Sequence, residues 1–195
     1  MQKIILASQS PRRRQLLEWA EVPFTVIVSD TDESYPGGLT FEETAIHIAR
    51  NKALAVKQTC RDLKDQPGLL PILAADTIVV LNNKIIGKPT NREDALFILS
   101  ELSGHQHQVI TGVVILNNEK EIAFADTTMV EFYELTATQI EFYVDKYQPY
   151  DKAGAYAIQE WIGVVGIKSV SGDFYNVMGL PVSRVVQALQ HLGIV

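Results

Sequence analysis

The stretch Lys3-Ile-Ile-Leu-Ala-Ser-Gln-Ser-Pro-Arg-Arg-Arg14 decides how the chain begins to fold. Its apolar run, residues 3–7, predicts a short buried strand. Ser10 and Pro11 follow this run and are typical of the N-cap and the first position of a helix. Apolar residues then recur at helical spacing. The stretch therefore predicts a strand that turns directly into a helix, as in α/β proteins.

Further helix-start signals and apolar runs extend this alternation along the chain. Capping boxes at Thr40–Glu43, Thr90–Glu93 and Thr136–Gln139 each predict a helix, and Pro181 predicts the last one. Strands are predicted at Phe24–Val28, Leu69–Leu81, Lys84–Ile86, Val109–Leu116, Glu121–Tyr133, Tyr156–Ile158, Val164–Ile167 and Phe174–Val177.

Turn signals between these runs indicate how the strands connect. The pairs Asn82-Asn83 and Asn117-Asn118 suit hairpin turns, and Asp65–Gly68 predicts a loop. Hairpins join antiparallel neighbours, whereas strand–helix–strand connections join parallel ones. We therefore expect an α/β fold with a mixed β-sheet flanked by helices.

Composition and charge narrow the class of protein. The chain has 195 residues, enough for one domain at 1–195 or two lobes that share a cleft. The single cysteine, Cys60, cannot form an internal disulfide, and no apolar run is long enough to span a membrane. The first residues lack the pattern of a signal peptide, so we expect a cytoplasmic protein. Its 17 Lys and Arg against 23 Asp and Glu give a net charge of −6, which argues against nucleic-acid binding.

The predicted turn from strand to helix is the first candidate binding site. Ser8 and Ser10 supply hydroxyls there, and Arg12, Arg13 and Arg14 supply guanidinium groups. Backbone N–H groups at a helix start attract anions, and arginine matches phosphate oxygens. The alternative is a capped helix with basic residues on its solvent face. Because that arrangement opposes the helix dipole by roughly a few tenths of a kcal/mol per arginine, the pattern favours phosphate binding.

A second candidate is Asp76, which follows Ala74 and Ala75 in a strongly apolar run. A carboxylate in such surroundings is costly unless it is paired, hydrogen-bonded or bound to a metal. The alternative is an aspartate that only caps a turn. Lys88, after Gly87, is a fragment of a P-loop without the rest of that motif, so on its own it predicts a solvated loop lysine.

Other polar residues give weaker signals. Gln159, at the end of Asp151–Gln159, offers an amide to the edge of a base, although a lone glutamine is more often a surface residue. His105 and His107 alternate as on one face of a strand but lack partners at metal spacing, so we expect no zinc site. Cys60 has no activating neighbour in the sequence, which argues against nucleophilic catalysis.

The order of these segments resembles the Maf family of nucleoside triphosphate pyrophosphatases. The matching segments are Leu6–Arg13, Glu33, Ala49–Ala53, Ala75–Thr77, Gly87–Pro89, Ser103–His107, Thr111-Gly112, Lys152–Gln159 and Met178–Pro181. No single segment is diagnostic, but their order and spacing along almost the whole chain are specific. The resemblance implies an α/β fold with a central cleft, similar to that of the inosine-triphosphate pyrophosphatases, and a homodimer.

The resemblance also implies a reaction, the hydrolysis of a nucleoside triphosphate between its α and β phosphates. Asp76 matches the catalytic aspartate of the family, which is the proton acceptor. The triphosphate-binding positions are matched by Ser8, Arg12, Arg13, Lys52 and Lys88. Glu33 matches an acidic residue of the same site. The highly charged substrate implies a divalent metal, Mg²⁺ or Mn²⁺, with Glu33 and Asp76 as candidate ligands.

Substrate specificity is implied by matches at Arg12, Thr77 and Gln159. The pattern Ala155-Tyr-Ala-Ile-Gln159 is similar to the branch of the family that acts on dTTP and UTP. The branch that acts on 7-methyl-GTP has a different pattern there. Two alternatives stay open at this point: a 7-methyl-GTP pyrophosphatase, and a nucleotide-binding regulator of division without turnover. The presence of both Asp76 and Lys88 favours an enzyme over the regulator.

Overall fold

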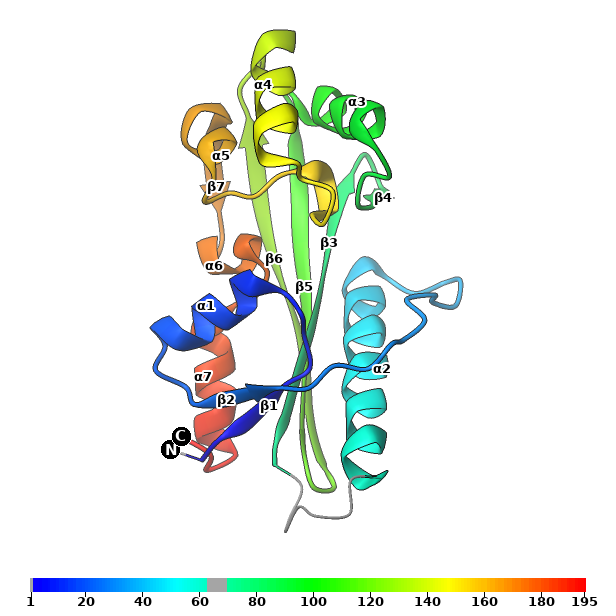
Figure 1. Cartoon of the computed structure of the whole chain (residues 1–195), viewed down its shortest axis with the longest axis vertical. Helices are drawn as coiled ribbons and strands as arrows, with labels where there is room; N and C mark the ends of the chain where they lie inside the picture. The colour runs from blue at the N-terminus through cyan, green and yellow to red at the C-terminus, as the bar shows by residue number, and fades with distance from the viewer. Residues whose placement is uncertain (1, 63–69) are drawn as a thin grey trace. The chain divides into compact units, whose positions relative to one another are not determined.

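The computed structural model of the protein describes residues 2–62 and 70–195 (Figure 1). Its strands are β1 (Ile4–Leu6), β2 (Phe24–Val26), β3 (Ile72–Leu81), β4 (Lys84–Ile86), β5 (Gln106–Asn117), β6 (Lys120–Phe132) and β7 (Ile167–Ser171). Its helices are α1 (Pro11–Trp19), α2 (Phe41–Asp62), α3 (Arg92–Leu102), α4 (Ala137–Tyr147), the 3-10 helix η1 (Ala153–Ala155), α5 (Trp161–Gly166), α6 (Phe174–Met178) and α7 (Val182–His191).

The described strands form one seven-stranded mixed sheet. Its order is β2-β1-β3-β5-β6-β7, with β4 paired to β3. β1 runs parallel to both β2 and β3, whereas β3–β4 and β6–β7 are antiparallel pairs. Helices alternate with these strands along the chain. The predicted α/β class, with a mixed sheet flanked by helices, is therefore confirmed.

The chain divides into two compact units. Unit 1 comprises Met1–Asp76, Thr111–Asp126 and Gly179–Val195, and unit 2 comprises Thr77–Ile110 and Thr127–Met178. β3, β5 and β6 contribute residues to both units. The assignment of 1–195 to a single Maf-like domain with two lobes around one cleft stays a prediction.

Unit 1 begins as its first residues predict. β1 is fully buried and pairs in register with β3, Ile5 opposite Ile72. The chain then turns into α1, where the Ser10 side chain accepts a hydrogen bond from the backbone N–H of Arg13 and Pro11 is the first helical residue. The two ends of the chain meet in this unit, because the N–H of Gln2 donates to the carbonyl of Ile194 at 2.8 Å (Figure 1).

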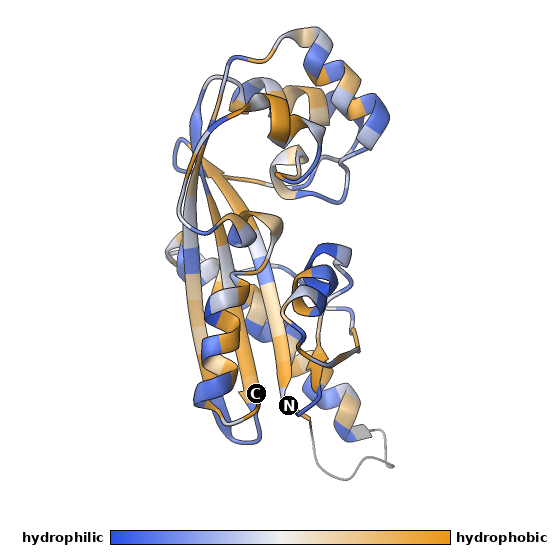
Figure 2. Ribbon diagram, turned by 90° about the vertical axis from the view of Figure 1, so that its left-hand side faces the viewer, coloured by the Kyte–Doolittle hydropathy of each residue, from blue (hydrophilic) through white to orange (hydrophobic). Residues whose placement is uncertain are grey.

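Helix α2 supplies most of the cover over one face of the unit 1 strands. It starts at the predicted capping box, in which the N–H of Glu43 donates to Thr40 Oγ1 and the N–H of Thr40 donates to Glu43 Oε2. One stripe of α2 packs against the strands, in a core of Ile5, Ala7, Ala49, Ala53, Val56, Cys60, Ile72, Ala74, Val114 and Leu116. In Figure 2 the strands are mostly hydrophobic, whereas hydrophobic and hydrophilic residues alternate along the helices.

The close contact between α2 and β5 depends on Gly112. A Cβ atom at this position would lie 2.3 Å from the backbone carbon of Ala45 in the first turns of α2. Such a distance is impossible without a shift of the helix, so glycine sets how closely α2 approaches the sheet. Lys52 lies further along the same helix, and its position depends on this packing.

Unit 2 contains two of the predicted start and turn signals. Asn82 and Asn83 both have positive φ and close the hairpin between β3 and β4, as predicted. Thr136 and Gln139 form the predicted capping box of α4. These local signals were sufficient because each contains its own hydrogen-bonding partners within a few residues.

The start of α3 is one residue later than its sequence predicts. Asn91, and not Thr90, caps the helix by accepting a hydrogen bond from the N–H of Asp94. The Asp94 carboxylate in turn accepts hydrogen bonds from the N–H and the hydroxyl of Thr90. The predicted box at Thr90–Glu93 is therefore wrong, because Asn91 caps the helix and Thr90 bonds to Asp94 instead of to Glu93.

Three predicted strands of unit 2 are also wrong. Tyr156–Ile158 is irregular, Val164–Ile167 lies mostly in α5, and Phe174–Val177 lies in α6. α5 has six residues and α6 has five, so neither is long enough to show a helical period among its apolar residues. The predicted loop at Asp65–Gly68 falls outside the described residues. Within residues 2–62 and 70–195, no helix has the length and apolar character that crossing a membrane requires.

Candidate active site

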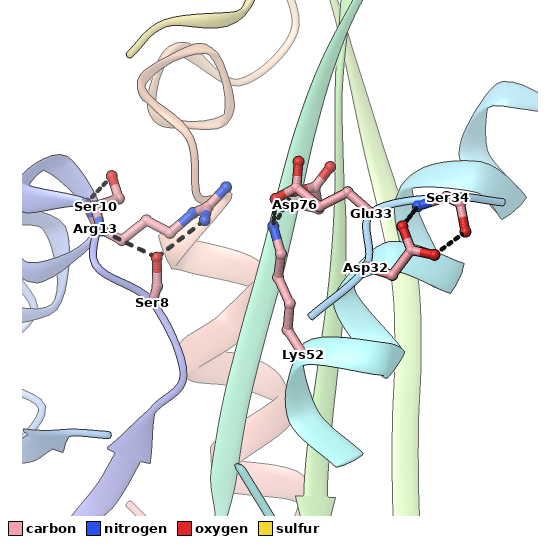
Figure 3. Close-up of polar contacts among 8 residues, drawn as sticks. All are labelled: Ser8, Ser10, Arg13, Asp32, Glu33, Ser34, Lys52 and Asp76. Atoms are coloured by element: carbon pink, nitrogen blue, oxygen red, sulfur yellow. Dashed lines mark hydrogen bonds and ion pairs between the residues drawn. The ribbon is translucent and has the colours of Figure 1, made fainter. Parts of the chain in front are cut away.

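The N-terminal turn of α1 places a buried guanidinium in unit 1. Arg13 is 9% exposed, and its Nε donates to the carbonyl of Gly179 at 2.7 Å. Its Nη1 donates to Ser8 Oγ at 3.1 Å, and the same oxygen accepts the N–H of Ser10 at 3.2 Å. Figure 3 shows the guanidinium directed toward Asp76. The alternative of basic residues on a solvent face is therefore wrong for Arg13.

The surroundings of Arg13 combine burial with charges of both signs. Burial is the largest effect and lowers the pKa of the guanidinium, Arg12 lowers the pKa further, and the charges of Asp76 and Glu33 raise it. Arginine keeps its proton at any pH the protein experiences. The charge of this buried cation is therefore compensated in part by two carboxylates.

Lys52 joins those two carboxylates. Its Nζ lies 2.6 Å from Asp76 Oδ1 and 2.7 Å from Glu33 Oε1. The side chains of Lys52 and Asp76 are 18% and 14% exposed, whereas that of Glu33 is 51% exposed. The paired carboxylate expected for Asp76 is therefore present, and the alternative of a simple turn cap is wrong. A half-exposed partner such as Glu33 can give up Lys52 to a charged ligand at small cost.

Local hydrogen bonds position Glu33. It lies between Asp32 and Ser34, and the Asp32 carboxylate accepts hydrogen bonds from the N–H of Ser34 at 2.9 Å and from its hydroxyl at 2.6 Å. These bonds from Ser34 lower the pKa of Asp32, so this small turn holds at neutral pH. The turn directs Glu33 toward Lys52 on α2 (Figure 3).

Unit 2 contains the other predicted site residues. Lys88 and Gln159 are both exposed. Lys88 follows Gly87, whose carbonyl accepts a hydrogen bond from the N–H of Gly154 at 3.1 Å. That bond places the residue before Lys88 beside Gly154, which precedes Gln159 by five positions. Thr77 is half-buried and is the first residue of this unit.

Taken by unit, the predicted residues fall into two groups. The structure brings together Ser8, Arg13, Glu33, Lys52 and Asp76 in unit 1 (Figure 3). Arg12 is half-buried and precedes Arg13 on α1. Thr77, Lys88 and Gln159 belong to unit 2.

Two features of these sites were not predicted. The carbonyl of Gly179 holds Arg13, but a backbone oxygen has no residue-specific signal, and only the matched motif Met178–Pro181 marks the place. In unit 2, Lys152 is buried and its Nζ lies 3.6 Å from Glu160 Oε1, while Tyr143 donates a short hydrogen bond to Glu160. The sequence offered only the match of Lys152–Gln159 as a signal for this network.

The carboxylates of Asp76 and Glu33 in unit 1 are the candidate ligands of a divalent metal. Among the described residues no group of three or more His, Cys, Asp and Glu side chains converges. Asp76 and Glu33 nevertheless converge on one cation, the ammonium of Lys52. Mg²⁺ takes oxygen ligands and commonly uses one or two carboxylates together with substrate phosphates. Two carboxylate groups that already share a cation fit that requirement.

The two histidines of Ser103–His107 have different surroundings. His107 is buried, its Nε2 lies 2.7 Å from the hydroxyl of Tyr156, and burial lowers the pKa of its ring to about 4. His105 is exposed and precedes β5. Cys60 lies on the buried face of α2, and burial raises the pKa of its thiol, which makes it a poor nucleophile.

Comparison with known proteins gives the family of the chain. The family model described as "Maf-like protein" matches residues 3–192. The dTTP/UTP pyrophosphatase of Parabacteroides distasonis is 49% identical over 190 residues, which are 97% of this chain and 95% of that protein. The proteins of the same name from Bacteroides thetaiotaomicron and Cytophaga hutchinsonii are each 48% identical over 97% of this chain, and 96% and 84% of those proteins are covered. The chain belongs to the Maf family.

Proposed function

We propose that the protein hydrolyses dTTP and UTP to the nucleoside monophosphate and pyrophosphate. The observation that carries this proposal is the cluster of unit 1, in which Lys52 bridges Asp76 and Glu33 while the buried Arg13 faces Asp76. Close relatives that bear the name dTTP/UTP pyrophosphatase match almost the whole chain. Neither a 7-methyl-GTP pyrophosphatase nor a regulator without turnover has an observation of its own in its favour.

The cations of the cluster neutralise the triphosphate. A nucleoside triphosphate carries about four negative charges, and pyrophosphate takes most of them when it leaves. Arg13 is already oriented by Gly179 and Ser8, so it meets the phosphate oxygens without reorganising. Lys52 can exchange its bond to the half-exposed Glu33 for a phosphate oxygen. We assign further phosphate contacts to Ser8, Arg12 and Lys88.

Asp76 is the proposed proton acceptor. Its carboxylate has one oxygen bound to Lys52. A carboxylate held in this way can orient a water molecule toward the α phosphorus and take its proton. Lys52 fixes the geometry of that carboxylate, so the two residues act as a unit in the proposed reaction.

A divalent metal completes the proposed site. Asp76 and Glu33 would hold Mg²⁺ or Mn²⁺, with phosphate oxygens and water as the remaining ligands. When bound, the metal supplies positive charge next to the phosphate oxygens.

Gln159 is the proposed reader of the base, together with Arg12 and Thr77. A glutamine amide has both a donor and an acceptor, and the edge of uracil or thymine presents carbonyl acceptors beside the N3–H donor. The amide can flip and so exchange its donor and acceptor to suit cytosine. A second fixed group is therefore needed to select uracil or thymine over cytosine. A guanidinium only donates, which favours a carbonyl at position 4 of the base over an amino group. Arg12 is the guanidinium that we assign to this role, and Thr77 is the third residue that we assign to base recognition.

Three further expectations belong to the proposal. We expect a homodimer, a cytoplasmic location, and no binding of nucleic acid. The single cysteine supports a cytoplasmic location, and the net charge of −6 argues against binding of nucleic acid. Size-exclusion chromatography with light scattering measures the first directly.

The test of the proposed function is a substrate panel. We expect kcat/KM for dTTP and UTP to exceed the values for CTP, GTP and 7-methyl-GTP when pyrophosphate release is measured with Mg²⁺ or Mn²⁺. The variant Gln159→Glu loses the amide donor, and the ranking of substrates should change. A preference of the wild-type protein for 7-methyl-GTP would place it in the other branch of the family. An unchanged ranking for Gln159→Glu would remove Gln159 from base recognition.

A further inference from the structure

One tyrosine of α4 holds both sides of the turn that carries Gln159. Tyr143 is fully buried, and its hydroxyl accepts a hydrogen bond from the N–H of Ala157 at 3.2 Å. The same hydroxyl donates a short hydrogen bond to Glu160 Oε2. It therefore binds the chain two residues before Gln159 and again one residue after it. Gln159 itself is exposed, so its backbone is fixed while its amide stays accessible.

The buried ammonium of Lys152 forms ion pairs at the start of the segment that leads to Gln159. The side chain of Lys152 is 9% exposed, and its Nζ lies 3.6 Å from Glu160 Oε1 and 2.8 Å from Asp151 Oδ1. A buried ammonium without a partner is strongly destabilising, and Asp151 and Glu160 together compensate the charge of Lys152. Glu160 thus receives Tyr143 on one oxygen and approaches Lys152 with the other.

Close backbone packing fixes the turn from its C-terminal side. The N–H of Gly163, in the first turn of α5, donates to the carbonyl of Glu160 at 2.9 Å. A Cβ atom at Gly163 would lie 1.8 Å from the carbonyl oxygen of Ile158. Any side chain at this position must therefore displace the residue directly before Gln159.

We propose that Tyr143 and Glu160 are positioning residues for Gln159, and that the base selectivity of the enzyme depends on them. This inference rests on the proposed function of Gln159. An amide distinguishes donors from acceptors on a base only when its backbone is held within about 0.5 Å of one position. The hydrogen bonds and the ion pair described above provide that restraint from side chains that are themselves buried or half-buried.

The first variant is Tyr143→Phe, which removes only the hydroxyl. We expect the ratio of kcat/KM for dTTP to that for GTP to fall on the order of 5- to 30-fold, the effect of losing a buried hydrogen bond. The change should appear mainly as a higher KM for dTTP, with kcat altered less than about threefold, because binding of the base is affected and the phosphate chemistry is not. A purely structural role for Tyr143 would lower the fraction of active enzyme equally for both substrates and leave the ratio unchanged.

A matched control and a conservative variant make the test specific. Tyr147→Phe makes the same chemical change on the same helix, in a ring that stacks on Tyr143 at 5.0 Å, and it should leave the ratio unchanged. Glu160→Gln keeps an oxygen acceptor for the Tyr143 hydroxyl and should retain more of the selectivity than Glu160→Ala. If Tyr143→Phe fails to fold, Glu160→Ala and Gly163→Ala test the same restraint.

Two outcomes separate this inference from the proposed function. If Gln159→Ala lowers the dTTP to GTP ratio but neither Tyr143→Phe nor Glu160→Ala does, the positioning role is refuted and the function of Gln159 stands. If Gln159→Ala itself leaves the ratio unchanged, the proposed reading of the base is refuted, and the positioning role with it. The double variant Tyr143→Phe with Gln159→Ala should have the same dTTP to GTP ratio as Gln159→Ala alone. That result would support the positioning role, because Tyr143 would then act only through Gln159.

Discussion

The two units use their charged side chains in different ways. In unit 1, Lys52 is shared between Asp76 and a half-exposed Glu33, so its bonds can be exchanged for bonds to a ligand. In unit 2, Glu160 accepts a hydrogen bond from Tyr143 and lies near the buried Lys152, and Gln159 beside it presents an exposed neutral amide. The contrast suggests a division of labour. Chemistry on a polyanion needs charges that can change partners, whereas reading a base needs a neutral group on a fixed backbone.

The largest effect is expected for Asp76→Asn. The amide keeps an oxygen acceptor for Lys52 but cannot accept a proton from water, so turnover should fall by a factor of about 10² or more while folding is retained. Pyrophosphate release and thermal melting measure the two properties. The control is Asp126→Asn, in an aspartate of unit 1 that lies 3.7 Å from Arg184 and has no proposed role. Near-normal activity of folded Asp76→Asn would show that the catalytic carboxylate lies elsewhere.

Lys52→Met tests whether the shared cation is part of the chemistry. The change leaves Asp76 and Glu33 without their common partner and removes one charge that would neutralise the substrate. We expect kcat/KM for dTTP to fall about 10- to 100-fold, corresponding to about 1.4–2.8 kcal/mol. Lys57→Met is the matched control on the same helix, since Lys57 Nζ donates only to the exposed carbonyl of Asn118 among the bonds described. Equal activity of both variants would assign Lys52 a structural role.

Arg13→Lys should have a smaller effect, which appears in the stability of the protein. An ammonium cannot reproduce the fork that donates to Gly179 and to Ser8, so one buried acceptor loses its partner. We expect the free energy of unfolding to decrease by about 1–3 kcal/mol. Urea denaturation compares this variant with Arg50→Lys, an exposed arginine bound to Glu121, for which the expected loss is below about 0.5 kcal/mol. Equal losses in the two variants would contradict the special role of the buried guanidinium.

The buried histidine of unit 2 predicts a pH dependence of stability. The pKa of His107 is about 4 in the folded protein and about 6.5 when unfolded, so the unfolded chain binds more protons between these values. The free energy of unfolding should therefore decrease as the pH falls from 6.5 toward 4, by about 2–3 kcal/mol at pH 4.5. His107→Gln should lose this part of the pH dependence, while the exposed His105→Gln should keep it. Urea denaturation at pH 7 and pH 4.5 measures the difference.

Local signals explain why much of the fold was predictable. Ser10 with Pro11, Thr40 with Glu43, and the pair Asn82-Asn83 each carry their own hydrogen-bonding or conformational requirement within a few residues, and all three behave as predicted. Phe174–Val177 is preceded by such a signal, Asp173, which the strand prediction did not take into account. The apolar residues of this segment predict a strand, but the N–H of Tyr175 donates to the Asp173 carboxylate and α6 begins there. In α6, which has five residues, the bond to Asp173 marks the helix start, whereas periodicity gives no guide.

The candidate site was predictable to a different extent in each unit. The hydroxyls and arginines at the start of α1 and the aspartate in an apolar strand have a chemical reason visible in the sequence. Lys52 and Glu33 were assigned only through the family resemblance, because Lys52 contacts Asp76 and Glu33 across 24 and 19 positions of the chain. The network of Tyr143, Lys152 and Glu160 was not predicted at all, since burial of a lysine depends on tertiary packing that no local pattern records.

The phosphorus products show which bond of the triphosphate the enzyme cleaves. The purified protein is incubated with dTTP and Mg²⁺, and the products are followed by phosphorus NMR, with Asp76→Asn as the inactive control. The account predicts dTMP and pyrophosphate as the primary products, at a rate that falls with the Asp76 variant. Primary formation of dTDP and orthophosphate would contradict it, because the site would then cleave the terminal phosphate and not the bond between the α and β phosphates.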